Sequence, residues 1–259
     1  MTNLPKLIIA LSVVTLTGGL AFAAGGGYLA PSSEPDVYAT IGAYPQDGSP
    51  ELARDKKAYD QTRKLKDTPR WALAISDVSK KPADIAKDFS CAVGTELDST
   101  NAPHLIALIA KMQKDASGVS GPAKDKYKRS RPFLDNDAPI CEERTAEKPN
   151  DSYPSGHTTM IWSVGLMLAH IVPDRADAIL ARTRAYGESR VVCGVHWLSD
   201  VEAGRVAGSV TYQALSLDPA FNADMEAAKT ELAAARANAV APDAKRCKVE
   251  AAAETHHPL

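Results

Sequence analysis

The chain has 259 residues, of which 44% are hydrophobic and 24% are charged, and its formal net charge is −2. These proportions are typical of a globular protein, and the length permits one or two domains. Nucleic acid is not expected as a partner, because a polyanion would require a basic excess or a basic stripe that the sequence lacks.

Residues 1–23 have the pattern of a signal peptide. Lys6 supplies a positive charge, residues 7–22 are uncharged and apolar, and Ala21-Phe22-Ala23 fits a small-x-small cleavage pattern. A membrane anchor is the alternative, since the apolar stretch is long for a signal. The flanks and the cleavage pattern favour the signal. We therefore expect export to the periplasm and no stable membrane insertion after cleavage.

Export would place four cysteines in an oxidising compartment, where an even number suggests disulfides. They are Cys91, Cys141, Cys193 and Cys247. Three pairings are possible, and the sequence does not choose among them. The cysteines form no closely spaced Cys/His ligand pairs, so a structural zinc site is not expected.

The predicted elements are all helices. Residues 24–50, rich in Gly, Pro and Ser, indicate an extended N-terminal segment. Helical spacing of apolar and small residues then predicts helices over 69–78, 83–92, 104–114, 157–171, 174–189, 195–216 and 219–239. Gly118, Gly121 and Pro122 mark the end of the third helix, and residues 240–259 indicate a flexible tail.

Residues 131–153 are polar and contain three prolines, which predicts a long loop. A loop of this length is more often functional than idle. Nowhere does the sequence alternate as a sheet strand would. We expect an all-α, single-domain helical bundle over residues 24–259, with the 157–171 helix at its core.

Three groups of residues in this framework could carry chemistry. They are Lys124 with Arg131-Pro132, then Pro154-Ser155-Gly156-His157, and then Ser189-Arg190, His196 and Asp200. Arg131 and Arg190 offer planar forks for phosphate oxygens, and Lys124 adds a point charge. Each cation alone would be interpreted as an ordinary surface charge, so the hypothesis depends on the combination.

Ser155-Gly156 is suited to open a helix at an anion site. Ser155 is a good N-cap, and Gly156 lets the backbone approach a ligand closely. Thr158 and Thr159 follow in the first turn, where an acidic residue would normally complement the helix dipole. The N–H groups are therefore available to an external anion. A plain helix cap explains Ser155 equally well, but not the neighbouring His157.

His196 and Asp200 lie four residues apart, so on a helix the carboxylate could reach one ring nitrogen. It would fix the tautomer and leave the other nitrogen free for attack. The alternative is a His–Asp pair on a helix surface.

Taken in order, Lys124-x6-Arg131-Pro132, Pro154-Ser155-Gly156-His157 and Ser189-Arg190-x5-His196-x3-Asp200 resemble the three-part signature of the type 2 phosphatidic acid phosphatase (PAP2) superfamily. Residues 151–158 and 187–197 are similar specifically to class A bacterial non-specific acid phosphatases. The resemblance implies the helical bundle shared with vanadium haloperoxidases. It also implies hydrolysis of nucleotides, sugar phosphates and aryl phosphates without metal or cofactor, phosphotransfer as a second potential activity, and a homo-oligomer.

The resemblance also implies a role for each residue. His196 attacks phosphorus to form a phosphohistidine, His157 protonates the leaving group, and Asp200 orients His196. The phosphate oxygens are held by Lys124, Arg131, Ser155, Gly156 and Arg190. Two positions depart from the class pattern, Asp151 in place of Gly and Leu198 in place of Pro.

Three alternatives to a secreted phosphatase remain. A vanadium haloperoxidase would use a similar anion cage, although this chain is short for that family. A membrane lipid phosphatase would need spanning helices that the mature sequence lacks. A non-catalytic phosphate-binding protein would need the cations but neither His157 nor His196.

Overall fold

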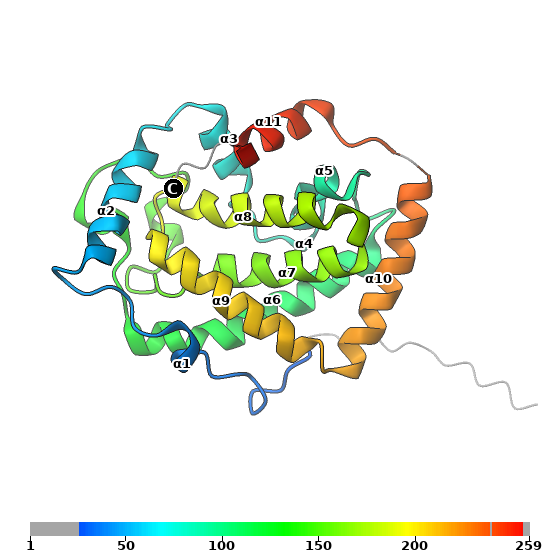
Figure 1. Ribbon diagram of the computed structural model, residues 1–259, viewed down its shortest axis with the longest axis horizontal. Coiled ribbons are helices and arrows are strands. Elements are labelled where there is room, and N and C mark those ends of the chain that lie inside the picture. The colour runs from blue at the N-terminus through cyan, green and yellow to red at the C-terminus, as the bar shows by residue number, and fades with distance from the viewer. Residues whose placement is uncertain (1–25, 239, 256–259) are drawn as a thin grey trace, which may run out of the picture.

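Helix α7 (Gly156–Ile171) runs through the middle of the molecule and packs against four other helices. These are α6 (Pro103–Tyr127), α8 (Ala176–Val192), α9 (Leu198–Leu215) and α10 (Pro219–Ala237) (Figure 1). The computed structural model describes residues 26–238 and 240–255. The described part contains no strand, which confirms the predicted all-α fold. The predicted signal, residues 1–23, lies outside it.

The sequence of α7 explains its central place. Apolar residues occur on every side of the helix, and a helix of this kind is stable only when it is surrounded by protein. Its buried hydroxyls bond within the helix. Thr159 Oγ1 donates to the Ser155 carbonyl at 2.9 Å, and Ser163 Oγ donates to the Met160 carbonyl at 2.8 Å. Both buried hydroxyls are therefore hydrogen-bonded.

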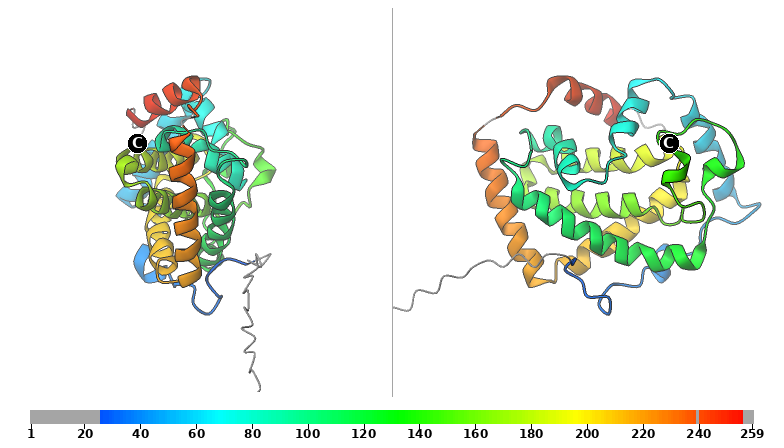
Figure 2. Two further views of the ribbon diagram at one scale, coloured as in Figure 1. Left: turned by 90° about the vertical axis from the view of Figure 1, so that its right-hand side faces the viewer. Right: turned by 180° about the vertical axis from the view of Figure 1, so that it is seen from behind.

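Shorter elements surround these five helices (Figure 2). They are α1 (Tyr38–Ile41), α2 (Pro50–Arg63), α3 (Pro69–Ser76), α4 (Pro82–Asp88), α5 (Ser90–Val93), α11 (Ala244–Thr255) and the 3₁₀ turns η1 (Pro132–Asp135), η2 (Arg144–Ala146) and η3 (Pro173–Arg175). The loop over 131–153 lies at the end of the bundle where α7 begins, and α10 closes the opposite end.

Helix α6 is longer than predicted. It continues through Gly118, Gly121 and Pro122, which were expected to end it, and stops at Tyr127. Val119 and Ala123 are buried on its extension, so tertiary packing stabilises a segment that local propensity disfavours. The Pro122 carbonyl also accepts a hydrogen bond from Tyr38 Oη at 2.7 Å.

Other boundaries also differ from the prediction. Residues 83–92 form two helices, α4 and α5, because the backbone is interrupted at Phe89. Helix α9 begins at Leu198 and not at 195, since Gly194 has a φ of 82° and a turn separates it from α8. Helix α2 was not among the predicted helices, because its buried face is largely polar and gives no apolar periodicity.

The predicted flexible tail is wrong over residues 244–255, which form α11. A disulfide joins Cys91 to Cys247 and attaches this helix to α5. Glu96 and Arg246 add an ion pair of 2.7 Å between the same regions. Cys141 and Cys193 carry free thiols, and the Cys141 amide donates to the Cys193 carbonyl at 3.1 Å.

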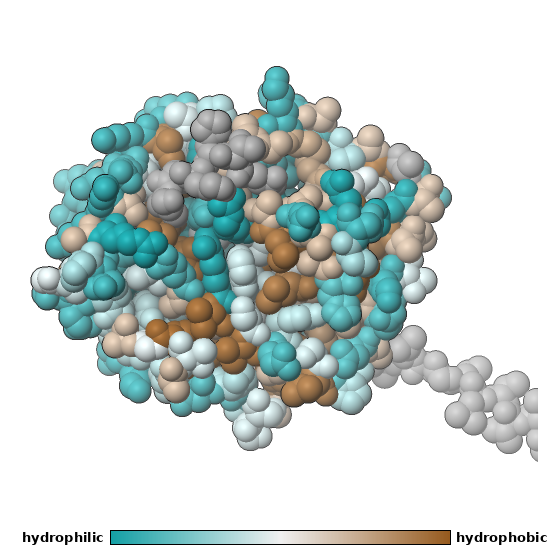
Figure 3. Space-filling model, viewed as in Figure 1, coloured by the Kyte–Doolittle hydropathy of each residue, from teal (hydrophilic) through white to brown (hydrophobic). Residues whose placement is uncertain are grey.

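Polar residues cover most of the face shown in Figure 3, with smaller apolar areas between them. The large apolar side chains that are exposed come from different parts of the chain, for example Ile75, Leu134 and Leu217. Within the described residues, no helix combines the length and the apolar character needed to cross a membrane.

Close packing of α9 on α7 depends on Gly208, where an added Cβ would lie 2.6 Å from the Thr159 carbonyl oxygen. We expect Gly208→Ala to lower the free energy of unfolding by about 1–3 kcal/mol, although alanine favours helix by about 1 kcal/mol. Urea unfolding would measure this. Gln213→Ala, at an exposed position of α9, should change it by less than about 0.5 kcal/mol. Equally small changes in the free energy of unfolding for the two variants would contradict the close packing of α9 on α7.

Candidate active site

A cavity of about 350 Å³ is lined by residues of the 131–153 loop and of the start of α7. It is lined by Lys80, Gln113, Ser117, Ser120, Gly121, Lys124, Arg131, Glu147, Lys148, Asp151, Gly156, His157, Met160 and His196. Arg190 and Asp200 are buried and contact Glu147 and His196 at this wall. Ser155 is buried directly before Gly156 and donates its N–H to the Asp200 carbonyl. The fold therefore brings together all eight residues that the sequence analysis singled out.

Ser155 closes the first turn of α7. Its Oγ accepts hydrogen bonds from the Thr158 N–H at 3.3 Å and from Thr158 Oγ1 at 3.0 Å, and its own N–H donates to the Asp200 carbonyl at 2.9 Å. Ser155 thus caps the helix and links it to α9. The first turn of α7 contains no acidic residue. Its positive end is therefore directed at the cavity without an internal carboxylate to neutralise it.

The two ring nitrogens of His196 have different partners. Nε2 lies 3.1 Å from Arg131 Nη1, and Nδ1 lies 3.3 Å from Asp200 Oδ2. Because a guanidinium can only donate, Nε2 must accept, and the proton belongs on Nδ1. Burial lowers the pKa of His196 well below its usual range, and the charges of Arg131 and Lys124 add to this effect. His196 is therefore neutral, with the Nε2 lone pair at the cavity wall.

Asp200 holds the His196 ring through a network of short bonds. Its Oδ2 accepts from Ser152 Oγ at 2.5 Å and from the Trp197 N–H at 2.8 Å, and its Oδ1 accepts from Arg129 Nη1 at 2.6 Å. Complete burial raises its pKa to about 6, although Arg129 and the hydrogen bonds oppose the rise. The carboxylate is thus held in one orientation.

The predicted contact between His196 and Asp200 exists, but its local geometry differs from the prediction. His196 lies in the turn before α9, so the two residues do not share a helix face. Asp200 instead occupies the third position of α9 and accepts the N–H of the capping residue Trp197. The carboxylate that caps the helix is also the one that contacts the histidine.

Arg129 and Asp55 extend this network and were missed by the sequence analysis. Arg129 Nη2 pairs with Asp55 Oδ2 at 2.7 Å, and Asp55 accepts the Ser199 N–H at 2.8 Å. Both charged side chains are almost fully buried. Arg129 lies in the basic segment 124–131, which by itself suggests solvated charges. No local signal distinguishes it from its neighbours.

His157 lies on the first turn of α7, 6% exposed. Neither ring nitrogen makes a hydrogen bond of normal geometry to a described residue, although the Asp77 backbone interacts with the ring. Burial lowers the pKa of His157 well below its usual range, with further contributions from Arg190 and Lys80. The Tyr186 ring stacks on it with centroids 5.6 Å apart. The imidazole is therefore positioned mainly by packing, and it lines the cavity.

Lys124, Arg131 and Arg190, here called the cation cluster, are matched by carboxylates from one loop. Lys124 pairs with Asp151 at 2.6 Å. Glu147 pairs with Arg131 at 2.6 Å and with Arg190 at 3.2 Å, and Glu142 also reaches Arg190 at 2.6 Å. Asp151, the departure from the class pattern, thus directs its carboxylate at the cluster. Glu142 and Glu147 were missed by the sequence analysis, because nothing local marks them.

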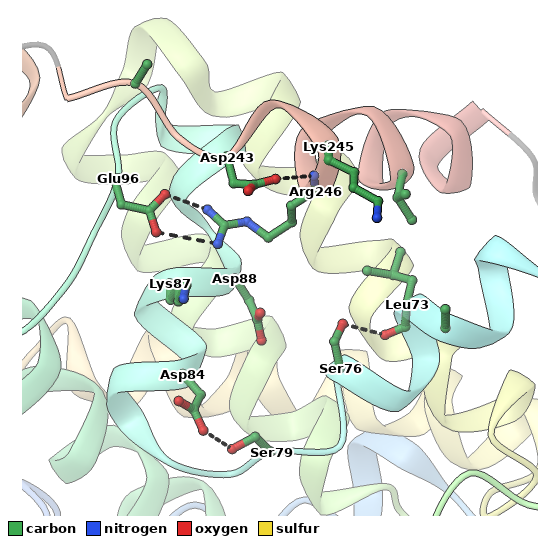
Figure 4. A pocket seen from close by; sticks show the side chains of 13 residues that line it. Leu73, Ser76, Ser79, Asp84, Lys87, Asp88, Glu96, Asp243, Lys245 and Arg246 are labelled. Carbon is green, nitrogen blue, oxygen red and sulfur yellow. Dashed lines mark hydrogen bonds and ion pairs between the residues drawn. The ribbon is translucent and has the colours of Figure 1, made fainter.

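A larger cavity, of about 830 Å³, lies elsewhere, between α3, α4 and α11. Figure 4 shows Glu96 paired with the Arg246 guanidinium, Asp243 accepting the Arg246 backbone N–H, and Ser79 donating to Asp84. Its lining includes no histidine. It therefore lacks the pair of histidines that lines the smaller cavity.

Comparison with known proteins identifies the family of the chain. Residues 104–222 match the model of the PAP2 superfamily. The chain is 44% identical over 223 residues to a protein named acid phosphatase from Zymomonas mobilis, covering 85% of this chain and 84% of the relative. The chain belongs to the PAP2 superfamily. The matched segment contains Lys124, His157, His196 and every other residue predicted for the site.

Two further relatives also have the names of acid phosphatases. A protein from Providencia stuartii named non-specific acid phosphatase is 36% identical over 209 residues, which cover 80% of this chain and 84% of the relative. One of the same name from Salmonella typhi is 34% identical over 191 residues, which cover 73% of this chain and 76% of the relative. The resemblance found in the three motifs is therefore confirmed at the level of the superfamily.

Removal of Arg129 tests the buried network. We expect Arg129→Met to lower the free energy of unfolding by about 3–5 kcal/mol at pH 7, because Asp200 and Asp55 would be left buried without their cation. The variant raises the pKa of Asp200 further above about 6, so the loss should shrink as pH falls and the carboxyl takes up a proton. Urea unfolding at several pH values measures both effects.

Arg54→Met is the matched control, because its ion pair with Glu202 is largely exposed. This substitution should lower the free energy of unfolding by less than about 1 kcal/mol, and the loss should depend little on pH. Similar losses in the two variants would contradict the assigned role of Arg129.

Proposed function

We propose that the protein is a secreted acid phosphatase that hydrolyses phosphate monoesters through a phosphohistidine at His196. The observation that carries the proposal is the neutral His196 ring, with Nδ1 held by Asp200 and Nε2 at the wall of a cavity lined by cations. The names of the relatives support the reaction class. The presence of His157 at the same wall favours catalysis over simple phosphate binding.

In the first step the phosphoryl group lies between the cation cluster and the start of α7. His196 Nε2 gives its lone pair to phosphorus while the bond from phosphorus to the ester oxygen breaks. His157, in its protonated form, transfers its proton to the departing oxygen. Asp200 stabilises the positive charge that develops on His196 by its contact with Nδ1.

The cation cluster stabilises the negative charge that is redistributed over the phosphoryl oxygens. Arg131 also affects the attack by His196. Its Nη1 contacts His196 Nε2, and it must exchange this hydrogen bond for one to a phosphoryl oxygen before Nε2 can attack. Gly156 allows Lys124 to approach the start of α7, since a Cβ there would lie 3.3 Å from Lys124 Cε. Ser155 contributes by capping that helix start.

In the second step His157 is neutral and accepts a proton from water as the water oxygen attacks phosphorus. The bond between phosphorus and Nε2 breaks, its electron pair returns to the ring, and inorganic phosphate leaves. An alcohol in place of water would give phosphotransfer. Because the free His157 has a lowered pKa, acidic solution favours the protonated form that the first step requires.

Three further parts of the proposal, the location, the oligomeric state and the substrates, rest on the sequence and on its resemblance to class A acid phosphatases. We infer export to the periplasm, a homo-oligomer, and broad use of nucleotides, sugar phosphates and aryl phosphates. The cavity wall formed by Gln113, Ser117 and Ser120 is polar and suits hydroxylated leaving groups.

Acid-quench trapping with labelled p-nitrophenyl phosphate tests the nucleophile. We expect label on His196 in the wild type, and loss of both label and turnover in His196→Asn, because asparagine has no nitrogen able to attack. Peptide mapping locates the label. Label on another residue would overturn the mechanism. Normal turnover by His196→Asn would point to a different reaction centre.

Replacement of His157 tests the proton donor. His157→Ala should reduce kcat/KM by about 10²–10⁴ for an alkyl phosphate, whose leaving oxygen needs a proton. The reduction should be much smaller for p-nitrophenyl phosphate, because nitrophenolate leaves without protonation. Steady-state kinetics with the two substrates measures the difference. Equal losses would assign His157 a role in binding instead.

A further inference from the structure

Glu147 occupies the space between the two guanidinium groups of the candidate site. Its Oε2 lies 2.6 Å from Arg131 Nη2, and its Oε1 lies 3.2 Å from Arg190 Nη2 and 3.4 Å from Lys80 Nζ. The Glu147 side chain is 8% exposed, and the residue lines the cavity together with His157 and His196. An internal carboxylate thus takes the bridging position that suits two oxygens of a phosphoryl group.

Other groups at this place lack partners. Arg190 Nε and Nη1 are buried without a hydrogen bond to any described residue. Buried donors of this kind are costly unless a ligand completes them. Glu147 therefore satisfies only part of the donor set, which indicates that a larger anion with more oxygens fits the same position.

We propose that Glu147 sets the affinity of the site for phosphate, by bridging Arg131 and Arg190 in the empty enzyme and being displaced when a phosphoryl group binds. This inference rests on the proposed function, since it takes phosphate as the ligand. A tetrahedral anion at the same guanidinium groups cannot coexist with the Glu147 carboxylate, so substrate and side chain compete.

The charges at the site favour a bound anion. Lys80, Lys124, Lys148, Arg131 and Arg190 lie at or beside the cavity, and the carboxylates there are Glu142, Glu147 and Asp151. When Glu147 is displaced, these cations outnumber the two remaining carboxylates, so the binding of a phosphate is favoured.

Displacement also links binding to a proton. Burial alone would raise the pKa of Glu147, but Arg131, Arg190 and Lys80 outweigh it and hold the pKa below the usual range. Beside a bound anion and away from these cations, the pKa must rise. Binding then takes up a proton, and affinity falls as pH rises. The other charged or titratable groups at this wall are Lys124, Lys148, Glu142, Asp151, His157 and His196.

The test uses the whole protein and inorganic phosphate as the probe. Glu147→Gln removes the competing charge, and Glu143→Gln removes the same charge from an exposed position of the same loop. Calorimetry should give Glu147→Gln a Kd for phosphate about tenfold lower than that of the wild type at pH 7, and Glu143→Gln a Kd within about twofold. The advantage of Glu147→Gln should shrink as pH falls, because the displaced Glu147 of the wild type then takes up a proton in the complex.

An unchanged Kd in Glu147→Gln, or a weaker one, would overturn the inference; weaker binding would mean that Glu147 positions the guanidinium groups. If Glu147→Gln does not fold, Glu147→Asp serves instead. Its shorter side chain bridges the pair less well, and it should also bind phosphate more tightly than the wild type. Calorimetry needs no turnover. The expected Kd change without p-nitrophenyl phosphate hydrolysis would therefore support this inference while the proposed function failed.

Discussion

The buried carboxylate of Asp200 connects the packing of the bundle with the orientation of the His196 ring. It caps α9 through Trp197, contacts Nδ1 of the histidine, and is balanced by Arg129. A buried carboxylate is stable only with such partners. The helix start, the ion pair and the His196 ring are consequently parts of one arrangement, and none can change position without disturbing the others.

The two sides of the cavity differ in how strongly they are held. On the His196 side, the groups around Asp200 lie on or beside α2, α6 and α9, and they are buried. On the opposite side, Glu142, Glu147 and Asp151 lie on a loop and pair with the cation cluster. Under the proposed function, a rigidly held His196 that faces exchangeable counter-charges suits a site that binds and releases an anion in each cycle.

Several helices could be predicted because local features determine them. Pro219 follows the capping residue Asp218 at the start of α10, and the apolar sequence of α7 permits only a buried helix. The far end of α6 could not be predicted, since Gly118 and Pro122 disfavour a helix that burial of Val119 and Ala123 then stabilises. Helix α11 and its disulfide depend on contacts between residues 156 apart.

The sequence by itself determined the family of the protein and predicted its site residues, because the three motifs are recognised by residue type and spacing. It placed His196, His157 and the cation cluster in one site without any coordinates. Only the tertiary structure decided which other charged residues lie in or beside this site. Arg129, Asp55 and Glu147 resemble surface residues in the sequence, and only the fold removes them from water and pairs them. Burial and pairing depend on distant segments, which no local pattern records.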